Sequence, residues 1–388
     1  MIKRALTPKL ISISKQFASV ALTGPRQSGK TTLVRETFPK KPYVLLEDPD
    51  TREFAQKDPR GFLAQYPRGA VLDEIQRVPA LFSYLQGILD ATKTPGLFIL
   101  TVSHNFLLME QITQSLAGRV ALLSLLPLSW QELSNSQNAF KTFEDHLFHG
   151  GYPKLYADHV NPQDLYANYV RTYIDRDVRL LKNVHDLSAF HTFLKLCANR
   201  VGQLLNLSSL ADECGITHNT AKAWISVLES SYILFLLRPH HNNLNKRLIK
   251  TPKIYFYDTG LAAYLMGITN NDMLTRHPLK GNLFECFIIS EIIKSQLNKG
   301  HDPNIYFWQD KLGREIDCII ENGNAPILVE IKSGKTVTDD YFKNITYWCD
   351  LSKNLASKAL IVYGGNASQK RTTGHVLGWQ EFLSSLPL

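Results

Sequence analysis

The sequence contains few cysteines and no long apolar run, and both absences narrow the class of protein. No C-x-x-C pair of the kind found in zinc or dithiol sites occurs among the five scattered cysteines, Cys197, Cys214, Cys286, Cys318 and Cys349. No stretch approaches the ~18 consecutive apolar residues of a membrane span, and the first residues lack the apolar centre of a secretion signal. We therefore expect a cytoplasmic protein with no membrane association.

Low-complexity tracts and internal repeats are also absent from the sequence. At 388 residues, of which 44% are apolar and 20% charged, the chain is long enough for two or three globular domains with separate cores. The formal net charge of +8 suits a polyanionic partner, although a surplus of this size does not identify one.

A phosphate-binding pattern, G-x-x-x-x-G-K-T, lies between an apolar strand-like run and a helix-forming stretch. Gly24 and Gly29 allow the tight turn that points backbone N–H groups at phosphates. Lys30 can reach the β- and γ-phosphate oxygens, the Thr31 hydroxyl can bind Mg²⁺, and the positive end of the following helix adds attraction. We expect the nucleotide to contact Gly24, Pro25, Arg26, Gln27, Ser28, Gly29, Lys30, Thr31 and Thr32.

An acidic pair follows a second apolar run, Ala70-Val-Leu-Asp73-Glu74, as in a Walker B segment. In this interpretation Asp73 holds the Mg²⁺ of the bound ATP and Glu74 polarises the attacking water. The alternative for the pair alone is a solvated strand end.

Residues 1–135 alternate apolar runs with helical stretches, which is typical of βαβ units and a parallel sheet. We predict an α/β domain with a P-loop NTPase core. Its expected strands cover residues 19–23, 43–47, 69–73, 97–101 and 120–124.

Two further groups in this domain are candidates for the hydrolysis site. Ser103 and Asn105 follow the expected fourth strand, where a polar side chain can sense the γ-phosphate; the alternative for Asn105 is a helix N-cap. Arg119, just before the last strand, is a candidate arginine finger that acts within the chain or on a neighbouring copy in a homo-oligomer. The alternative is a surface arginine.

For the middle of the chain we predict a helical connector over residues 136–190 and a winged-helix-like domain over residues 191–275. Residues 207–224 contain a short helix, a glycine turn at Gly215 and a second helix capped near Thr217, as in a helix-turn-helix. The apolar runs at residues 232–237 and 254–257 would form the wing.

A basic loop from Arg238 to Lys253 lies between these two runs. We predict that the loop contacts the phosphate backbone of DNA; a solvated hairpin loop is the alternative. Its basic residues are Arg238, His240, His241, Lys246, Arg247, Lys250 and Lys253.

The last unit, residues 276–388, contains a D…E-x-K arrangement on an expected hairpin, residues 315–320 and 327–331. Since side chains alternate along a strand, Glu330 and Lys332 share a face, and the partner strand brings Asp317 alongside. In restriction-type nucleases such carboxylates bind Mg²⁺ and the lysine helps to position water. Glu285, on the preceding helix, can add a ligand. A cross-strand salt bridge, or a fold kept without metal chemistry, remains the alternative.

Together these segments resemble a bacterial and archaeal family of AAA+-type ATPases that carry a C-terminal domain resembling restriction nucleases. The resemblance implies a P-loop core, a helical and winged-helix region and a restriction-endonuclease-like α/β domain. This chain departs from the family's usual Thr-Gly-Ser after the sensor strand, because it has Val102 between Thr101 and Ser103, which we expect to put a bulky side chain beside the phosphates. The matching motifs are Gly24–Thr31, Leu72–Gln76, Ser115–Arg119, Gly150–Pro153, Tyr173–Asp177, Tyr257–Leu261, Gly281–Glu285 and Val329–Ser333.

We therefore expect an ATP- and Mg²⁺-dependent ATPase that associates with DNA and couples its nucleotide state to the winged helix and the nuclease-like domain. The competing hypothesis is a nucleotide-dependent switch or adaptor that binds a protein partner and contains an inactive nuclease fold.

Overall fold

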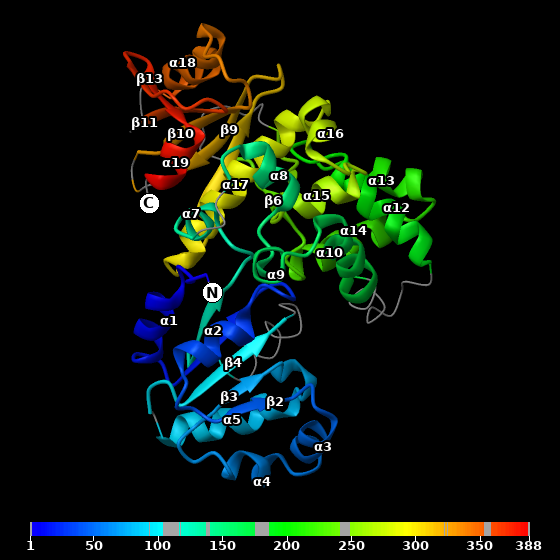
Figure 1. The fold of residues 1–388 in the computed structure, drawn as a ribbon, viewed down its shortest axis with the longest axis vertical. Coiled ribbons are helices and arrows are strands. Elements are labelled where there is room, and N and C mark those ends of the chain that lie inside the picture. Colours follow the sequence, from blue (N-terminus) through cyan, green and yellow to red (C-terminus); the bar gives the residue numbers. More distant parts are fainter. Residues whose placement is uncertain are drawn as a thin grey trace.

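The computed structural model describes residues 2–92, 94–103, 116, 118–136, 140–174, 186–240, 249–321, 323, 325–352 and 358–386. Figure 1 shows two lobes: the elements up to β5 (Val120–Ser124) form the lower one, and the later elements gather in the upper one. Asn105, the lysine-arginine pair Lys246 and Arg247, and the motif residues 175–177 lie outside the described residues.

A five-stranded sheet of order β2-β3-β4-β1-β5 forms the first lobe, and all its recorded pairings are parallel. The predicted parallel α/β core is therefore confirmed. The strands are β1 (Ser19–Thr23), β2 (Tyr43–Leu45), β3 (Val71–Asp73), β4 (Phe98–Val102) and β5 (Val120–Ser124).

Helices cover both faces of this sheet. The apolar side chains of α1 and α2 pack on Val20 and Leu22, and those of α5 pack on Leu72 and Leu100. Alternation along each strand therefore divides the core into two layers. The helices are α1 (Thr7–Ser14), α2 (Lys30–Thr37), α3 (Pro49–Lys57), α4 (Pro59–Ala64) and α5 (Ala80–Thr92).

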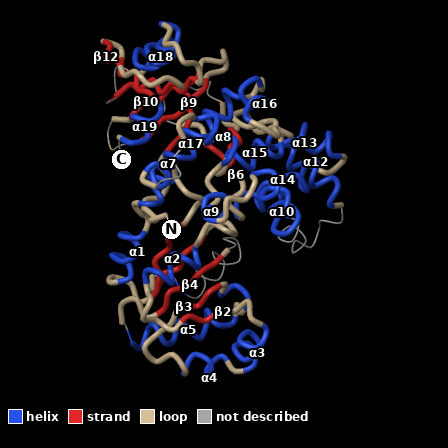
Figure 2. The backbone as a smooth tube through the Cα atoms, in the orientation of Figure 1, coloured by secondary structure: helices blue, strands red, loops and turns tan. Residues whose placement is uncertain are grey.

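The second lobe begins with short helices and a helix pair followed by a two-stranded hairpin (Figure 2). Gly215, with φ of 65°, ends α13, and the Thr217 side chain accepts a hydrogen bond from Thr220 N to begin α14. Strands β6 and β7 pair antiparallel after this helix pair. The elements are α7 (Trp130–Ser134), α8 (Phe143–His149), α9 (Pro153–Ala157), α10 (Pro162–Tyr169), α12 (Leu187–Ala198), α13 (Leu207–Cys214), α14 (His218–Ser230), β6 (Leu234–Leu237), β7 (Lys253–Phe256), α15 (Thr259–Leu265) and α16 (Asn271–Arg276).

The chain ends in a mixed six-stranded sheet of order β12-β13-β11-β10-β9-β8. Strand β10 pairs antiparallel with β9, as the hairpin prediction requires, and parallel with β11. The elements are α17 (Lys280–Asn298), β8 (Ile305–Gln309), β9 (Glu315–Ile320), β10 (Ile327–Lys332), α18 (Lys343–Leu351), β11 (Lys358–Tyr363), β12 (Gln369–Arg371), β13 (Gly374–Gly378) and α19 (Trp379–Ser384).

One hydrophobic core joins the middle of the chain to this sheet. It extends from Leu126 to Leu383 and therefore crosses the predicted boundary between residues 275 and 276. Helix α17 lies in its centre, and twelve of its nineteen residues are buried. No helix in the described part of the chain combines the length and apolar character needed to span a bilayer.

We expect Phe284→Ala in α17 to lower the free energy of unfolding by about 3–5 kcal/mol, because it leaves a cavity in this core. The Phe284 side chain is fully buried, and its ring centroid lies 4.6 Å from that of Phe143. Chemical denaturation measures the change. As a control, Leu312→Ala at a 79% exposed position should stay within about 0.5 kcal/mol of the parent. Equal effects of the two changes would contradict the shared core.

Candidate functional site

The loop after β1 has the backbone geometry that its glycines predict. Gly24 has φ of 146°, and a Cβ there would lie 2.1 Å from Leu125 O, so only glycine fits. Gly29, with φ of 93°, is the N-cap of α2. Gln27 also has positive φ, at 60°. The loop therefore turns sharply from the end of a buried strand into the N-terminus of a helix.

Lys30 is buried and lies over its own loop. Its Nζ donates to Gly24 O at 2.9 Å and to Pro25 O at 2.7 Å. Arg4 holds the loop from outside, because its guanidinium donates to Ser28 O at 2.6 Å. Sequence reasoning missed Arg4, which lies far from the loop in sequence and follows no motif.

Asp73 ends β3 beside the first turn of α2. One oxygen of its carboxylate accepts from the Thr31 hydroxyl at 2.7 Å and from the Tyr43 hydroxyl at 2.5 Å. The other oxygen accepts from the Thr101 hydroxyl. Burial and the neighbouring Asp73 raise the pKa of Tyr43, so its hydroxyl remains a donor. Tyr43 and Thr101 were not predicted, although Thr101 is a polar residue within an otherwise apolar strand.

Glu74 has left-handed backbone geometry, with φ of 59°, which non-glycine residues rarely adopt. Its backbone N–H donates to Thr101 Oγ1 at 3.0 Å, while its carboxylate accepts from Ser103 and, at 2.5 Å, from Gln76. Ser103 therefore lies at the carboxyl end of β4, in contact with the predicted water-polarising residue. This position is compatible with the predicted role of Ser103 as a sensor of the γ-phosphate.

Val102 does not face the phosphate loop. It is fully buried in the core layer under α5, because alternation along β4 points Thr101 and Ser103 to the opposite side. Our expectation of a bulky side chain beside the phosphates is therefore wrong.

Arg119 lies at the amino ends of the parallel strands, whereas the phosphate loop lies at their carboxyl ends. It precedes Val120, which pairs in parallel with Ser19 at the start of β1, whereas the loop follows Thr23 at the other end. The five residues of β1, at about 3.3 Å each, separate these two ends by about 17 Å. Arg119 pairs instead with Asp90 of α5, and its guanidinium Nη2 lies 3.0 Å from the carboxylate. A finger role within the same chain is excluded, and a role on a neighbouring copy stays a prediction.

The second lobe contacts the carboxyl end of β1, the strand before the phosphate loop, through Tyr232. This residue lies between α14 and β6. Its hydroxyl lies 2.8 Å from Thr23 Oγ1 and 3.2 Å from Ser124 Oγ. Tyr232 is buried and has φ of 58°. Thr23 directly precedes the phosphate loop, so this contact joins the hairpin to the loop.

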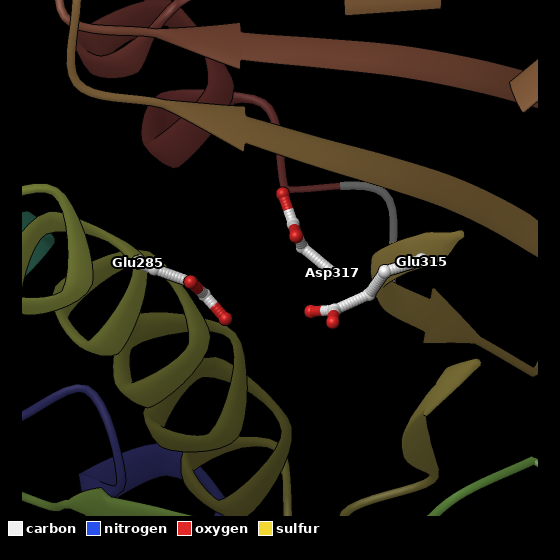
Figure 3. A group of neighbouring side chains, drawn as sticks. All are labelled: Glu285, Glu315 and Asp317. Carbon is white, nitrogen blue, oxygen red and sulfur yellow. The ribbon is translucent and has the colours of Figure 1, made fainter. Parts of the chain in front are cut away.

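A second polar group lies between α17 and the C-terminal sheet. Figure 3 shows Glu285 pointing from the helix toward Glu315 and Asp317 on β9. One carboxylate oxygen from each of these three residues lies within 4.8 Å of the others. On β10, Lys332 Nζ donates to Glu330 at 2.7 Å and to Asp317 at 3.3 Å. The structure therefore brings the four predicted residues together and adds Glu315, which the sequence pattern missed.

The neighbouring hairpin also enters this acidic group. Lys253, at the start of β7, has only 5% of its side chain exposed; its Nζ lies 3.3 Å from Glu285 and pairs with Glu315. Tyr255, two residues on, donates to Glu285. His240 is likewise buried and lies 3.1 Å from Glu321. Lys253 and His240 therefore cannot contact DNA as predicted, whereas Arg238 and Lys250 are exposed.

Burial dominates the charge states of these acids. It raises the pKa of Glu330 to about 8, assisted by the nearby Asp317 carboxylate and opposed by Lys332. Burial also raises the pKa of Glu285 to about 7 against the opposing effect of Lys253. The second carboxylate oxygen of Glu330 is buried and has no hydrogen-bond partner among the described residues. A buried oxygen of this kind fits a cation ligand.

The loop geometry and parallel sheet define the first domain as a P-loop ATPase domain. Residues 16–134 match a family described as an AAA domain, which is the same class. Residues 140–272 and 280–382 match two domains of unknown function, DUF8612 and DUF4143.

The chain belongs to the family of two mycobacterial proteins. It is 31% identical to "Uncharacterized protein Rv2008c" of Mycobacterium tuberculosis and to "Uncharacterized protein Mb2031c" of Mycobacterium bovis. Each match spans 325 residues and covers 82% of this chain and 70% of the relative.

Two solved structures are more distant. The Walker-type ATPase paby2304 of Pyrococcus abyssi is 14% identical with a TM-score of 0.46, and the match covers 67% of this chain and 94% of that one. AMPPCP-bound DnaA from Aquifex aeolicus is 11% identical with a TM-score of 0.28, at 58% and 85% coverage. Because both scores are below 0.5, the class of the first domain rests on the AAA match and the loop geometry.

We expect the metal-free protein to lose stability as pH rises from about 5 to about 8. The raised pKa of Glu330 means that the folded state binds more protons than the unfolded state in this range, so the free energy of unfolding falls with pH. Glu330→Gln removes this titration and should reduce the slope of the free energy of unfolding against pH, leaving the smaller part due to Glu285. Urea denaturation at several pH values in a chelating buffer measures how the free energy of unfolding changes with pH.

The control is Glu381→Gln on α19, an exposed position that should leave the pH dependence of the parent unchanged. Identical slopes for Glu330→Gln and the parent would show that Glu330 is ionised in both states.

Proposed function

We propose that the first domain binds Mg²⁺-ATP and hydrolyses it. The observation that carries this proposal is the convergence of Lys30, Thr31, Asp73 and Glu74 at the mouth of one glycine-turned loop. The loop fits a triphosphate, because backbone N–H groups at the start of α2 and a buried lysine meet there.

Each of these residues has a distinct part in this mechanism. Lys30 would turn its ammonium from the loop carbonyls to the phosphate oxygens, and Thr31 with Asp73 would hold Mg²⁺. Mg²⁺ would supply neutralisation of the charge that develops on the phosphate oxygens. Glu74 would orient the attacking water, with Ser103 and Gln76 fixing its carboxylate.

We expect Lys30→Ala to abolish ATP binding, and Glu74→Gln to retain it with turnover lowered by about 10²-fold or more, as for loss of a general base. Isothermal titration and phosphate release measure the two effects. Glu36→Gln, at an exposed position on α2, is the control and should hydrolyse ATP like the parent. Undiminished turnover in Glu74→Gln would exclude Glu74 as the water-orienting group.

We further propose that the protein associates with DNA and that the nuclease-like acidic group belongs to this role. Support comes from the helix pair followed by a hairpin and from the polar exposed face of α14, which includes Asn219, Lys222 and Ser226. The Asp317, Glu330 and Lys332 arrangement fits a divalent cation and an activated water. The contact between Tyr232 and Thr23 supplies a route from nucleotide to hairpin.

The competing proposal is a nucleotide-dependent switch that binds a protein partner through the second lobe. If the partner is a protein, we expect this chain to have negligible affinity for DNA. If the partner is DNA, we expect its affinity for DNA to fall steeply as the salt concentration rises.

We expect duplex DNA to bind with an affinity that falls steeply with salt, and Arg238→Ala with Lys250→Ala to reduce the salt slope by about 2, since each phosphate contact contributes about 0.9. Fluorescence anisotropy at several salt concentrations measures the slope. Lys15→Ala with Lys40→Ala, two exposed lysines of the first lobe, is the matched control and should keep the parent slope.

An unchanged slope in the first double variant would remove this surface from the DNA site. Absence of any salt-dependent binding by the parent would favour the protein-partner alternative.

A further inference from the structure

Lys253 is a cation that another part of the fold inserts into the acidic group. Its backbone belongs to β7 in the hairpin, not to the mixed sheet that supplies Glu315 and Asp317. Its Nζ lies 3.3 Å from Glu285 and also pairs with Glu315. This lysine is distinct from Lys332, which lies on β10 beside Glu330 and keeps 32% of its side chain exposed.

The three carboxylates around Lys253 have nearly the spacing of ligands on one metal ion. Their oxygens lie within 4.8 Å of one another, and opposite ligands of octahedral Mg²⁺ are separated by about 4.2 Å at 2.1 Å from the ion. The adjoining Glu330 is 3% exposed, shares the Lys332 ammonium with Asp317 and has one buried oxygen without a partner among the described residues. The geometry therefore suits a divalent cation, yet the Lys253 ammonium already pairs with two of the three carboxylates.

We propose that the Lys253 ammonium occupies the cation position of Glu285, Glu315 and Asp317, and that a divalent cation binds these carboxylates only when Lys253 is displaced. The inference rests on the nuclease-like site proposed above and concerns its resting state. An ammonium and a divalent cation cannot occupy the same position among these oxygens, because two cations at contact distance repel each other.

The hairpin controls whether Lys253 can leave. The Ile254 backbone bonds to the loop after α12, from Ile254 N to Gln203 O at 3.0 Å and from Gly202 N to Ile254 O at 2.8 Å. Because β7 is held on this side and paired with β6 on the other, displacement needs either side-chain rotation or a shift of the hairpin. The Tyr232 contact with Thr23 lies at the start of this hairpin. This contact is therefore a physical path from the phosphate loop to the hairpin that carries Lys253.

The test uses Mn²⁺ as the probe on the nucleotide-free chain of 388 residues. Lys253→Met removes the charge and keeps an unbranched side chain, and Lys253→Gln keeps a hydrogen-bond donor. Lys343→Met, at an exposed lysine of the same lobe, is the control. Isothermal titration and the electron paramagnetic resonance signal of free Mn²⁺ give affinity and stoichiometry, and thermal unfolding gives the metal-induced shift in Tm.

We expect both Lys253 variants to bind Mn²⁺ at least about tenfold more tightly than the parent, because a positive charge within contact distance is removed. Mn²⁺ should also raise their Tm more than it raises that of the parent or of Lys343→Met. If the variants fold only when Mn²⁺ is added, the metal has replaced the ammonium, which supports the proposal. Adding Glu315→Gln to Lys253→Met should abolish the gain, because one ligand is lost.

Equal Mn²⁺ affinity in the parent and both folded variants would overturn the proposal, as would variants that Mn²⁺ cannot stabilise. DNA cleavage, measured in parallel, separates this inference from the proposed nuclease function. Tighter Mn²⁺ binding without cleavage by any variant would leave Lys253 as the resident cation of a site that does not cut DNA. A parent that binds Mn²⁺ as tightly as the variants and cleaves DNA would leave the nuclease proposal intact and remove the role of Lys253.

Discussion

Burial of α17 is the constraint on which the second lobe depends. The helix packs against the mixed sheet on one side and against helices from the middle of the chain on the other, so it has almost no solvated face. Its polar residues need partners as a result. Glu291 accepts from Trp130 N at 2.7 Å, and Lys294 donates to Leu128 O at 3.2 Å, which ties the helix to the segment leaving the first lobe.

The same helix brings a carboxylate to the second polar site. Glu285 lies on the side of α17 that meets β7 and β9, and only 14% of its side chain is exposed because the helix around it is buried. Two lysines from different strands offset the charge of this region. Removing one member of such a group leaves a buried charge without compensation, so the site is sensitive to the position of each element that contributes to it.

Direct contacts join the two sites in the structure. Thr23 ends the strand before the phosphate loop and contacts Tyr232, and Tyr232 precedes the hairpin whose second strand carries Lys253 into the acidic group. A chain of packed and hydrogen-bonded elements is a physical path for coupling, provided that the hairpin has two arrangements. Gln27 in the phosphate loop, Glu74 after β3 and Tyr232 beside Thr23 all have left-handed backbone geometry, which places backbone strain in and next to the nucleotide site.

The sequence by itself determined the phosphate loop, the parallel sheet, the antiparallel pairing of β9 with β10 and the common face of Glu330 and Lys332. These features depend on local geometry: positive φ at glycines, alternation along strands and short connections. The partners of Asp73 at Tyr43 and Thr101, the Tyr232 contact and the insertion of Lys253 join residues far apart in sequence. Only tertiary packing decided them, because a buried polar side chain takes whichever partner the fold brings within hydrogen-bond distance. For the same reason Lys253 and His240, which look like solvated loop cations in the sequence, became buried partners of carboxylates. The distance of Arg119 from the phosphate loop also depended on the fold, since strand direction and pairing decide at which end of the strands it lies.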